Sequence, residues 1–437
     1  MVPGMTLPAS LLLVLRITRP CFTEHTFETF CHLAAGMVAQ TGRRTVTGML
    51  TGAGLARTWP HKRAHAFFSE ASWDPAQLGL RLARAVVEAL VPAGEPIVLV
   101  VDDTLVHRVG RKVFGALWAH DGSGRGKDKI GFGNTWVVCG IVVRLPFATR
   151  SVALPVLCRL WRGKATASRT DLALEMVHDL AAVFPGRDVH AVGDAAYHSG
   201  KVADLPRGVT FTTRLPRNAA LYGPTPPPTN KRGRPRKKGE ALGSLNSLAG
   251  KAKWRLAVIE RYGRHEWVWI SERSCLWYGA YRDLPCRLVL VRDLDSTKPY
   301  DLALITTDLH CEADDLAERY GQRWPIEPVF HQMREDLGVG EARNRTPRAV
   351  ERTVPFGLAV YTLTVLWYTL HGHHPADITD RRRHQPWYTT KRAPGFPDMV
   401  VKLRRTIIAA RYFDKPAGHP SPEEITAVTR AWAAAAA

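Results

Sequence analysis

Residues 97–104 read Ile-Val-Leu-Val-Val-Asp-Asp-Thr. Five apolar, mostly β-branched residues in a row predict a strand that is buried on both faces, as in the middle of a sheet. The apolar run stops at Asp102. We therefore expect two adjacent acids, Asp102 and Asp103, where this strand gives way to a loop.

Two more strands are expected downstream, at Val109–Phe114 and Trp136–Val143, on either side of a Gly-rich turn over residues 121–134. This spacing favours an antiparallel meander. Because the acid-ended strand and the meander follow each other without a helical pattern, all three are expected in one sheet.

A helix is predicted next. Thr170-Asp171 provides its start, and Pro185-Gly186 ends it. Residues 189–192 then form a short apolar strand that leads directly into Gly193-Asp194. The order strand, strand, strand, helix, strand predicts an α/β fold with an acid at the end of its first and last strands.

Helical patterns dominate both ends of the chain. Asp74-Pro75 is an N-cap followed by proline at the first helical position, and apolar residues recur every fourth position to Leu90. The apolar run Leu11–Leu15 is interpreted as core. The uncharged stretch Val354–Leu370 is interpreted as a buried helix, because it falls short of the roughly 20 residues needed to cross a bilayer.

The composition indicates a folded protein that meets a polyanion. The 437 residues include 60 Lys and Arg against 40 Asp and Glu, a net charge of +20, with 45% hydrophobic residues. This hydrophobic content excludes disorder of the whole chain, and the charge favours nucleic acid, with an anionic membrane surface as the weaker alternative. Seven scattered cysteines with no C-x-x-C pair argue against a disulfide framework and a zinc ribbon.

A cluster of charged residues lies between Tyr320 and Arg334. At about 100° per residue, Tyr320, Arg323, Glu327 and Arg334 would share one face of a helix. Because Pro325 can start or kink a helix, Tyr320 and Arg323 could instead lie on the preceding turn. Acids at the ends of neighbouring strands, joined by Glu327 from a helix, can share a divalent cation through oxygen ligands.

At these residues the chain resembles insertion-sequence DDE transposases of the cut-and-paste type, which have an RNase H-like core. Their signature is Y-x2-R-x3-E-x6-K; here Tyr320, Arg323 and Glu327 match, and Arg334 stands in place of the lysine. V-D-D-T at 101–104 and G-D-A-A-Y at 193–197 resemble the family's two aspartate motifs. The resemblance covers roughly residues 20–370.

The resemblance implies that Asp102, Asp194 and Glu327 are catalytic and bind two Mg²⁺ ions, for which Mn²⁺ can substitute. Arg323 and Arg334 would clamp DNA phosphates, and Tyr320 would contact a terminal phosphate or a hairpin end. The partners would be double-stranded DNA, as element ends and target, and a second copy of the chain in a synaptic homodimer. The protein would work in the cytoplasm with the bacterial nucleoid, without a membrane.

Either of the adjacent acids could be the ligand. Side chains alternate along a strand, so Asp102 and Asp103 would point to opposite faces. Asp102 shares its face with Thr104, and the family's D-x-T pattern agrees with Asp102. A register with the acid directly before the threonine would assign Asp103 instead.

Further DNA contacts are expected from a basic run in the insertion. Six of its eight residues are basic: Lys231, Arg232, Arg234, Arg236, Lys237 and Lys238. The run resembles a minor-groove arm, although such runs are also solvated loops. Sequence-specific recognition is assigned to the N-terminal unit, around Arg43-Arg44 and His61-Lys62-Arg63.

The predicted fold class is α/β, an RNase H-like mixed sheet flanked by helices and interrupted by a β-rich insertion, with a helical N-terminal domain. The expected segments are a DNA-binding helical domain at 1–93, the core at 94–209, the insertion at 210–305, the rest of the core at 306–375 and a C-terminal helical region at 376–437. Two alternatives stay open for the function: a catalytically silent DNA-binding derivative of such an enzyme, and a stand-alone RNase H-like nuclease.

Overall fold

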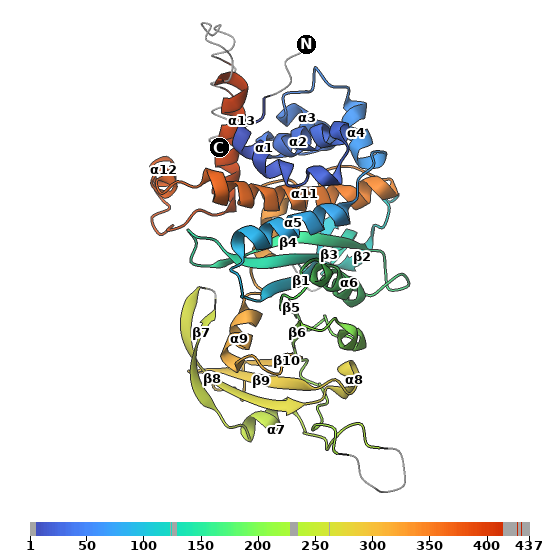
Figure 1. Cartoon of the computed structure of the whole chain (residues 1–437), viewed down its shortest axis with the longest axis vertical. Coiled ribbons are helices and arrows are strands. Elements are labelled where there is room, and N and C mark those ends of the chain that lie inside the picture. The colour runs from blue at the N-terminus through green and yellow to red at the C-terminus, as the bar shows by residue number, and fades with distance from the viewer. Residues whose placement is uncertain are drawn as a thin grey trace.

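The computed structural model describes residues 6–122, 124, 129–227, 235–261 and 263–413, with residues 426 and 430. Figure 1 shows a layer of helices at one end, a central twisted sheet below it, and a strand-rich lobe at the other end. The mixed α/β architecture agrees with the predicted fold class. The five segment boundaries stay a prediction.

The helices before the first strand form the upper layer. They are α1 (Ala9–Arg16), η1 (Arg19–Cys21), α2 (Glu24–Ala39), α3 (Val46–Gly52), α4 (His61–Ser69) and α5 (Pro75–Leu90). The predicted start at Asp74 is confirmed, since its carboxylate accepts a hydrogen bond from the Ala76 N–H at 2.7 Å. Of the run expected as core, Leu11, Val14 and Leu15 are buried, whereas Leu13 is 54% exposed because it lies on the outer side of α1.

Ten strands form one sheet. They are β1 (Ile97–His107), β2 (Leu117–His120), β3 (Ile130–Arg144), β4 (Ser151–Trp161), β5 (Val189–Gly193), β6 (Val209–Arg214), β7 (Arg255–Arg261), β8 (Arg264–Cys275), β9 (Cys286–Asp293) and β10 (Leu302–Thr306). The order is β2-β3-β1-β5-β6-β10-β9-β8-β7, with β4 also paired to β3. Strands β4, β3 and β1 are antiparallel neighbours, whereas β1, β5 and β6 run parallel.

Three details of the predicted meander were wrong, the first being the turn expected over residues 121–134, because β3 already begins at Ile130. Strand β1 does not stop at Asp102 but runs on to His107, because Thr104-Leu105-Val106 continues the β-branched and apolar pattern. Val109–Phe114 is not a strand: Gly110 begins a turn in which its carbonyl accepts from the Val113 N–H, and Val109 is fully exposed. Asp102 and Asp103 therefore both lie inside strand β1.

The strand β4 was missed because Pro155 interrupts its apolar run. Proline has no N–H to donate to a ladder, so it is expected only at edges or irregularities. Here the register between β3 and β4 shifts at Cys139/Gly140, and Pro155 lies opposite Gly140 at that shift. The irregularity accommodates the proline within the sheet.

The helix after β4 and the strand after it are confirmed. Helix α6 (Arg169–Val183) begins with a capping box between Ser168 and Asp171, close to the predicted start, and β5 follows at Val189–Gly193. A short 3₁₀ helix, η2 (Gly200–Asp204), then precedes β6. Asp194 is the first residue after β5.

The insertion extends the core sheet instead of forming a separate one. Strand β6, at its start, pairs parallel with β5, and β10 joins β6 to the hairpin strands β9, β8 and β7. The insertion also contains α7 (Leu245–Gly250) and α8 (Tyr278–Tyr281). A second, smaller apolar cluster forms where β7, β8, β9 and β10 pack against α9 (Ala313–Gly321).

The remaining helices are α10 (Ile326–Glu335), α11 (Pro347–Trp367) with a π-helical turn at Tyr368–Gly372, α12 (Asp377–His384) and α13 (Phe396–Phe413). Helix α11 packs against α5, α4 and β4, so it lies between the N-terminal helices and the sheet. The segment Pro347–Gly372 is long and apolar enough to cross a membrane, but 89% of its apolar window is buried inside the protein. This agrees with the predicted buried helix.

Candidate active site

Asp102 and Asp194 come from neighbouring parallel strands. Val100 of β1 pairs with Val192 of β5. Continuing this register by two residues brings Asp102 level with Asp194, and adjacent strands lie about 4.8 Å apart. The charge of Asp194 also contributes to the raised pKa of both Asp102 and Asp103, after the larger effect of burial. The two sequence motifs thus meet at one place on the sheet.

Asp102 is held by a guanidinium. Its Oδ2 lies 2.9 Å from Nη1 of Arg323, and its Oδ1 accepts a hydrogen bond from the Asp103 N–H at 2.8 Å. Burial raises the pKa of the Asp102 carboxyl to about 7, even though Arg323 opposes the shift. Burial therefore disfavours the ionised form of Asp102, and Arg323 favours it.

Asp103 has different partners. Its Oδ2 lies 3.0 Å from Nη1 of Arg169 in α6, and its Oδ1 accepts a hydrogen bond from the Tyr197 hydroxyl at 3.0 Å. Burial raises the pKa of Asp103, and Arg169 counteracts this. The two adjacent acids therefore face different elements: α6 for Asp103 and the turn before α10 for Asp102.

Glu327 pairs with the same arginine as Asp102. Its Oε1 lies 3.0 Å from Nη2 of Arg323, so one guanidinium bridges an acid from β1 and an acid from α10. The expectation of a single helical face was wrong in part, because α9 ends at Gly321 and α10 begins at Ile326, directly after Pro325. Arg323 lies on the intervening turn, which the proline alternative predicted.

Tyr320 and Arg334 flank this group. Nη1 of Arg334 donates to the Thr104 hydroxyl at 2.9 Å, on the same strand as Asp102. Tyr320 is half-buried, and burial is the main cause of its raised pKa. The charges of Arg323 and Arg214 oppose this shift, and that of Asp194 adds to it. The structure therefore gathers Asp102, Asp194, Tyr320, Arg323 and Glu327, with Arg334 beside them.

The acids fit a divalent cation in chemistry, but a guanidinium now lies between two of them. Carboxylate oxygens are the ligands that Mg²⁺ and Mn²⁺ prefer. In the described part of the chain, however, no three Asp, Glu, His or Cys side chains form a group that could hold a metal ion. A metal held by Asp102, Asp194 and Glu327 would require Arg323 to release at least one carboxylate. The metal triad stays a prediction.

The basic run is only partly described, since Lys231, Arg232 and Arg234 lie outside the described residues. Arg236 is exposed, and Nζ of Lys237 lies 3.7 Å from Asp283. The Lys238 ammonium lies over the rings of Tyr222 and Tyr278, at 3.8 and 5.0 Å from their centroids. Lys238 therefore anchors the end of the loop, and whether the run binds DNA stays a prediction.

Sequence reasoning missed two residues of the site, Arg169 and Tyr197, which hold Asp103. Tyr197 ends the G-D-A-A-Y motif at 193–197, so its place in that motif was the signal that could have identified it. Arg169 begins α6 far from either motif, and only the fold brings it to β1. No sequence pattern marks it.

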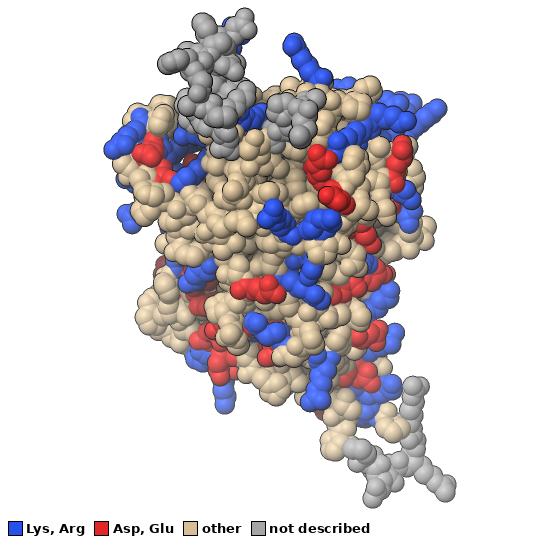
Figure 2. All heavy atoms as spheres, turned by 45° about the horizontal axis from the view of Figure 1, so that its top comes forward, with Lys and Arg blue, Asp and Glu red and all other residues tan. Residues whose placement is uncertain are grey.

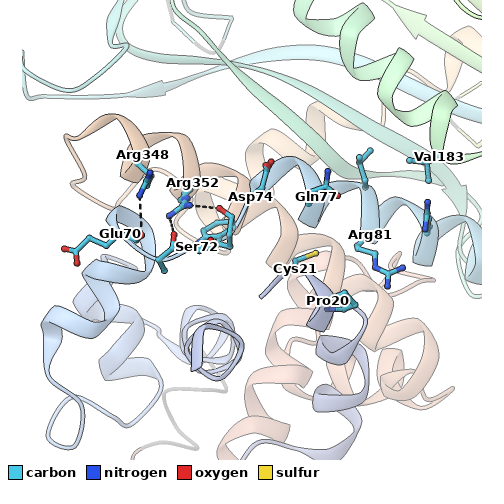
Figure 3. Close-up of a pocket in the computed structure, with 14 residues that line it drawn as sticks. Pro20, Cys21, Glu70, Ser72, Asp74, Gln77, Arg81, Val183, Arg348 and Arg352 are labelled. Atoms are coloured by element: carbon cyan, nitrogen blue, oxygen red, sulfur yellow. Dashed lines mark hydrogen bonds between the residues drawn. The ribbon is translucent and has the colours of Figure 1, made fainter. Parts of the chain in front are cut away.

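One large cavity among the described residues lies away from the acids. It measures about 770 Å³ and is lined by residues of α5, the loop before it and the start of α11. Figure 3 shows Arg348 and Arg352 pointing to backbone carbonyls of the α4–α5 connection; the Arg352 guanidinium donates to the Ala71 carbonyl at 2.7 Å. The cavity reaches Val183 at the end of α6, whereas Arg169 at the start of α6 contacts Asp103, about 20 Å away along the helix.

The strand order β4-β3-β1-β5-β6, with Asp102 in β1 and Asp194 directly after β5, defines an RNase H-like α/β protein. The chain matches the family described as "DDE superfamily endonuclease" over residues 19–275, more than half of its length, and it belongs to that family. Enzymes of this family act as nucleases or transposases on DNA and generally use divalent metal ions. The match includes Asp102, Asp103 and Asp194 and ends before Glu327. No curated protein matches the chain at a significant level.

Proposed function

We propose that the protein is a DNA transposase of the cut-and-paste type. It binds the terminal inverted repeats of its element, cleaves phosphodiester bonds in a reaction that depends on Mg²⁺ or Mn²⁺, and joins the 3′ ends to target DNA. The observation that carries the proposal is the bridge from Asp102 through Arg323 to Glu327, beside Asp194. It joins the Y-R-E signature to the first aspartate motif within a DDE endonuclease fold.

In this proposal, Asp102, Asp194 and Glu327 hold the metal. Two bound ions would supply activation of water or of a 3′-hydroxyl and stabilisation of the leaving oxygen. Arg323, once it releases a carboxylate, is a bidentate donor for a DNA phosphate at the same place. Arg334 keeps the positive charge of the signature lysine, and its bond to Thr104 fixes it beside the acids.

Asp103 has a positioning role in this arrangement. Both of its oxygens are engaged by Arg169 and Tyr197, which ties β1 to α6 and to the turn after Asp194. The proposal also includes a homodimer that holds both element ends, and a location in the cytoplasm with the nucleoid.

The test uses a supercoiled plasmid that carries the DNA flanking the reading frame on both sides. With Mg²⁺ or Mn²⁺ we expect cleavage at the element ends and joined products; with Ca²⁺ or EDTA we expect binding without cleavage. Glu327→Gln should abolish cleavage while end binding stays within a few-fold, because the change removes one metal ligand but little phosphate-binding surface.

Two other outcomes would contradict the proposal and favour a different function. Cleavage without any strand joining would indicate a stand-alone nuclease. Binding of the ends with no cleavage in either active metal would indicate a silent DNA-binding derivative.

A further inference from the structure

An exposed apolar group lies at one end of the sheet, beyond the acids. Trp118 of β2 and Ile130 of β3 are 71% and 63% exposed, and Val109 on the turn after β1 is fully exposed. The Trp118 ring lies beside the half-buried Phe132 ring, with 5.5 Å between their centroids. An indole this exposed, supported by a second ring, offers a flat apolar surface to solvent.

The strand register places Trp118 and Phe132 on the same face of the sheet as Asp102. Thr104 pairs with Trp136, and β3 continues without a bulge through Asn134 to Phe132, which pairs with Trp118. Because side chains alternate along a strand and directly paired residues share a face, Trp118 and Phe132 point to the side of Asp102 and Thr104.

The distance along the sheet from Asp102 to Trp118 fits a short length of DNA strand. In the β1–β3 register, Phe132 is level with residue 108, six positions beyond Asp102. At about 3.3 Å per residue this corresponds to about 20 Å. A strand with its scissile phosphate at the acids would reach Trp118 within a few nucleotides.

The end of the sheet that carries Trp118 also carries exposed cations. The loop at 340–345 packs here, since Arg108 donates to the Gly340 carbonyl and the Phe114 N–H to the Arg345 carbonyl. The side chains of Arg111, Lys112, Lys129, Arg343 and Arg345 are exposed, and none forms an ion pair within the described residues. Among the described residues of the loop between β2 and β3, Asp121 is buried and pairs with His107 at 2.9 Å.

We propose that Trp118, supported by Phe132, is a stacking platform for an unpaired base of the DNA strand that leads away from the catalytic acids. The proposal rests on DNA being the substrate, as in the proposed function. Exposed cations that follow a backbone, together with an aromatic surface for bases, are the features of single-strand binding sites. A second copy of this chain is a poorer occupant of this surface without DNA between the copies, because the exposed cations beside Trp118 attract an anion.

The experiment measures binding without cleavage. Two labelled DNAs with the same end sequence, a blunt duplex and a duplex with a short single-stranded overhang, are titrated with protein in Ca²⁺, and anisotropy gives the Kd. Trp118→Ala should weaken overhang binding about tenfold or more and leave blunt-duplex binding within about twofold, because one base can no longer stack. Trp118→Phe should restore most of the affinity.

Trp267→Ala is the matched control. Trp267 is also well exposed, at 57%, but it lies on β8 near the opposite end of the sheet order. A 2-aminopurine in the overhang gives a second signal: its emission should be quenched by the wild type and by Trp118→Phe, and not by Trp118→Ala.

Three outcomes would overturn the platform: wild-type overhang affinity in Trp118→Ala, equal weakening of both DNAs, or weaker overhang binding in Trp267→Ala instead. The measurements of overhang binding and of 2-aminopurine emission do not depend on strand joining. A platform confirmed in Ca²⁺ alongside absent joining would reject only the transposase proposal, and joining with an inert Trp118 would reject only the platform.

Discussion

At the scale of single residues, one guanidinium determines how the acids are arranged. Arg323 bridges Asp102 and Glu327, and Arg169 holds Asp103. The sequence left the choice between Asp102 and Asp103 open. We keep Asp102 as the proposed ligand, because among the described residues it pairs with the arginine that also holds Glu327.

We expect Asp102→Asn to abolish metal-dependent cleavage and Asp103→Asn to leave measurable activity. Asp103→Asn should lower the free energy of unfolding by about 1–3 kcal/mol, since the bond to Arg169 loses its charge. Single-turnover cleavage and urea denaturation of the two matched variants measure both effects. Full activity in Asp102→Asn, with none in Asp103→Asn, would transfer the catalytic role to Asp103.

At the scale of elements, a buried polar row links the core to the insertion. His190 of β5 is hydrogen-bonded to Thr210 and Thr212 of β6, and the Thr212 hydroxyl donates to Thr306 of β10 at 2.8 Å. Asp308 and Arg319 face the same histidine. Burial, aided by Arg319 and opposed by Asp308, lowers the pKa of His190 to about 3.

This row predicts a pH dependence of stability. Between about pH 6.5 and pH 3, His190 is protonated in the unfolded chain and neutral in the folded protein. The unfolding free energy should therefore fall as the pH is lowered through this window, by at most about 1.4 kcal/mol per unit from this residue. His190→Gln should flatten the slope between pH 6.5 and 4.5, measured by denaturation. The exposed His178 in α6 is the control, and an unchanged slope in His190→Gln would contradict the prediction.

Elements with strong local signals were predictable, and those defined by pairing were not. The capped start of α5, the helix α6 and the apolar strand β5 follow from residues within each segment. Strand β4 contains a proline that only its partner β3 makes acceptable. Likewise, the three acids could be picked from motifs, whereas Arg169 came to Asp103 only through packing of α6 on β1.

At the scale of the whole molecule, positive charge is spread over distant surfaces. Figure 2 shows Lys and Arg side chains gathered on the end formed by the N-terminal helices and spread over the faces below. Two of the arginines assigned to specific recognition are engaged internally: Arg44 donates to the Asp336 carbonyl at 3.0 Å, and Arg63 pairs with Glu28 at 2.6 Å. Arg43 and Lys62 are exposed, and their contact with DNA stays a prediction.

Deleting residues 231–238 should weaken binding to all duplexes similarly. It should also flatten the plot of log K against log salt by about 0.9 for each DNA phosphate that the run neutralises. Lys251→Ala, an exposed lysine of the same insertion, is the single-charge reference. Titrations at several salt concentrations measure the slope, and an unchanged slope would show that the run neutralises no phosphate.

The order of the strands along the chain also determines when all three acids have been synthesised. Asp102 and Asp194 precede the insertion, but Glu327 follows it, and strands β6 to β10 lie between them in the chain. A polypeptide emerging from the ribosome therefore displays two acids long before it acquires the third. Chains interrupted by a premature stop within the insertion would retain the basic N-terminal helices without the carboxylate of α10. Under the proposed function these fragments would lack the third metal ligand, so we expect them not to cleave DNA.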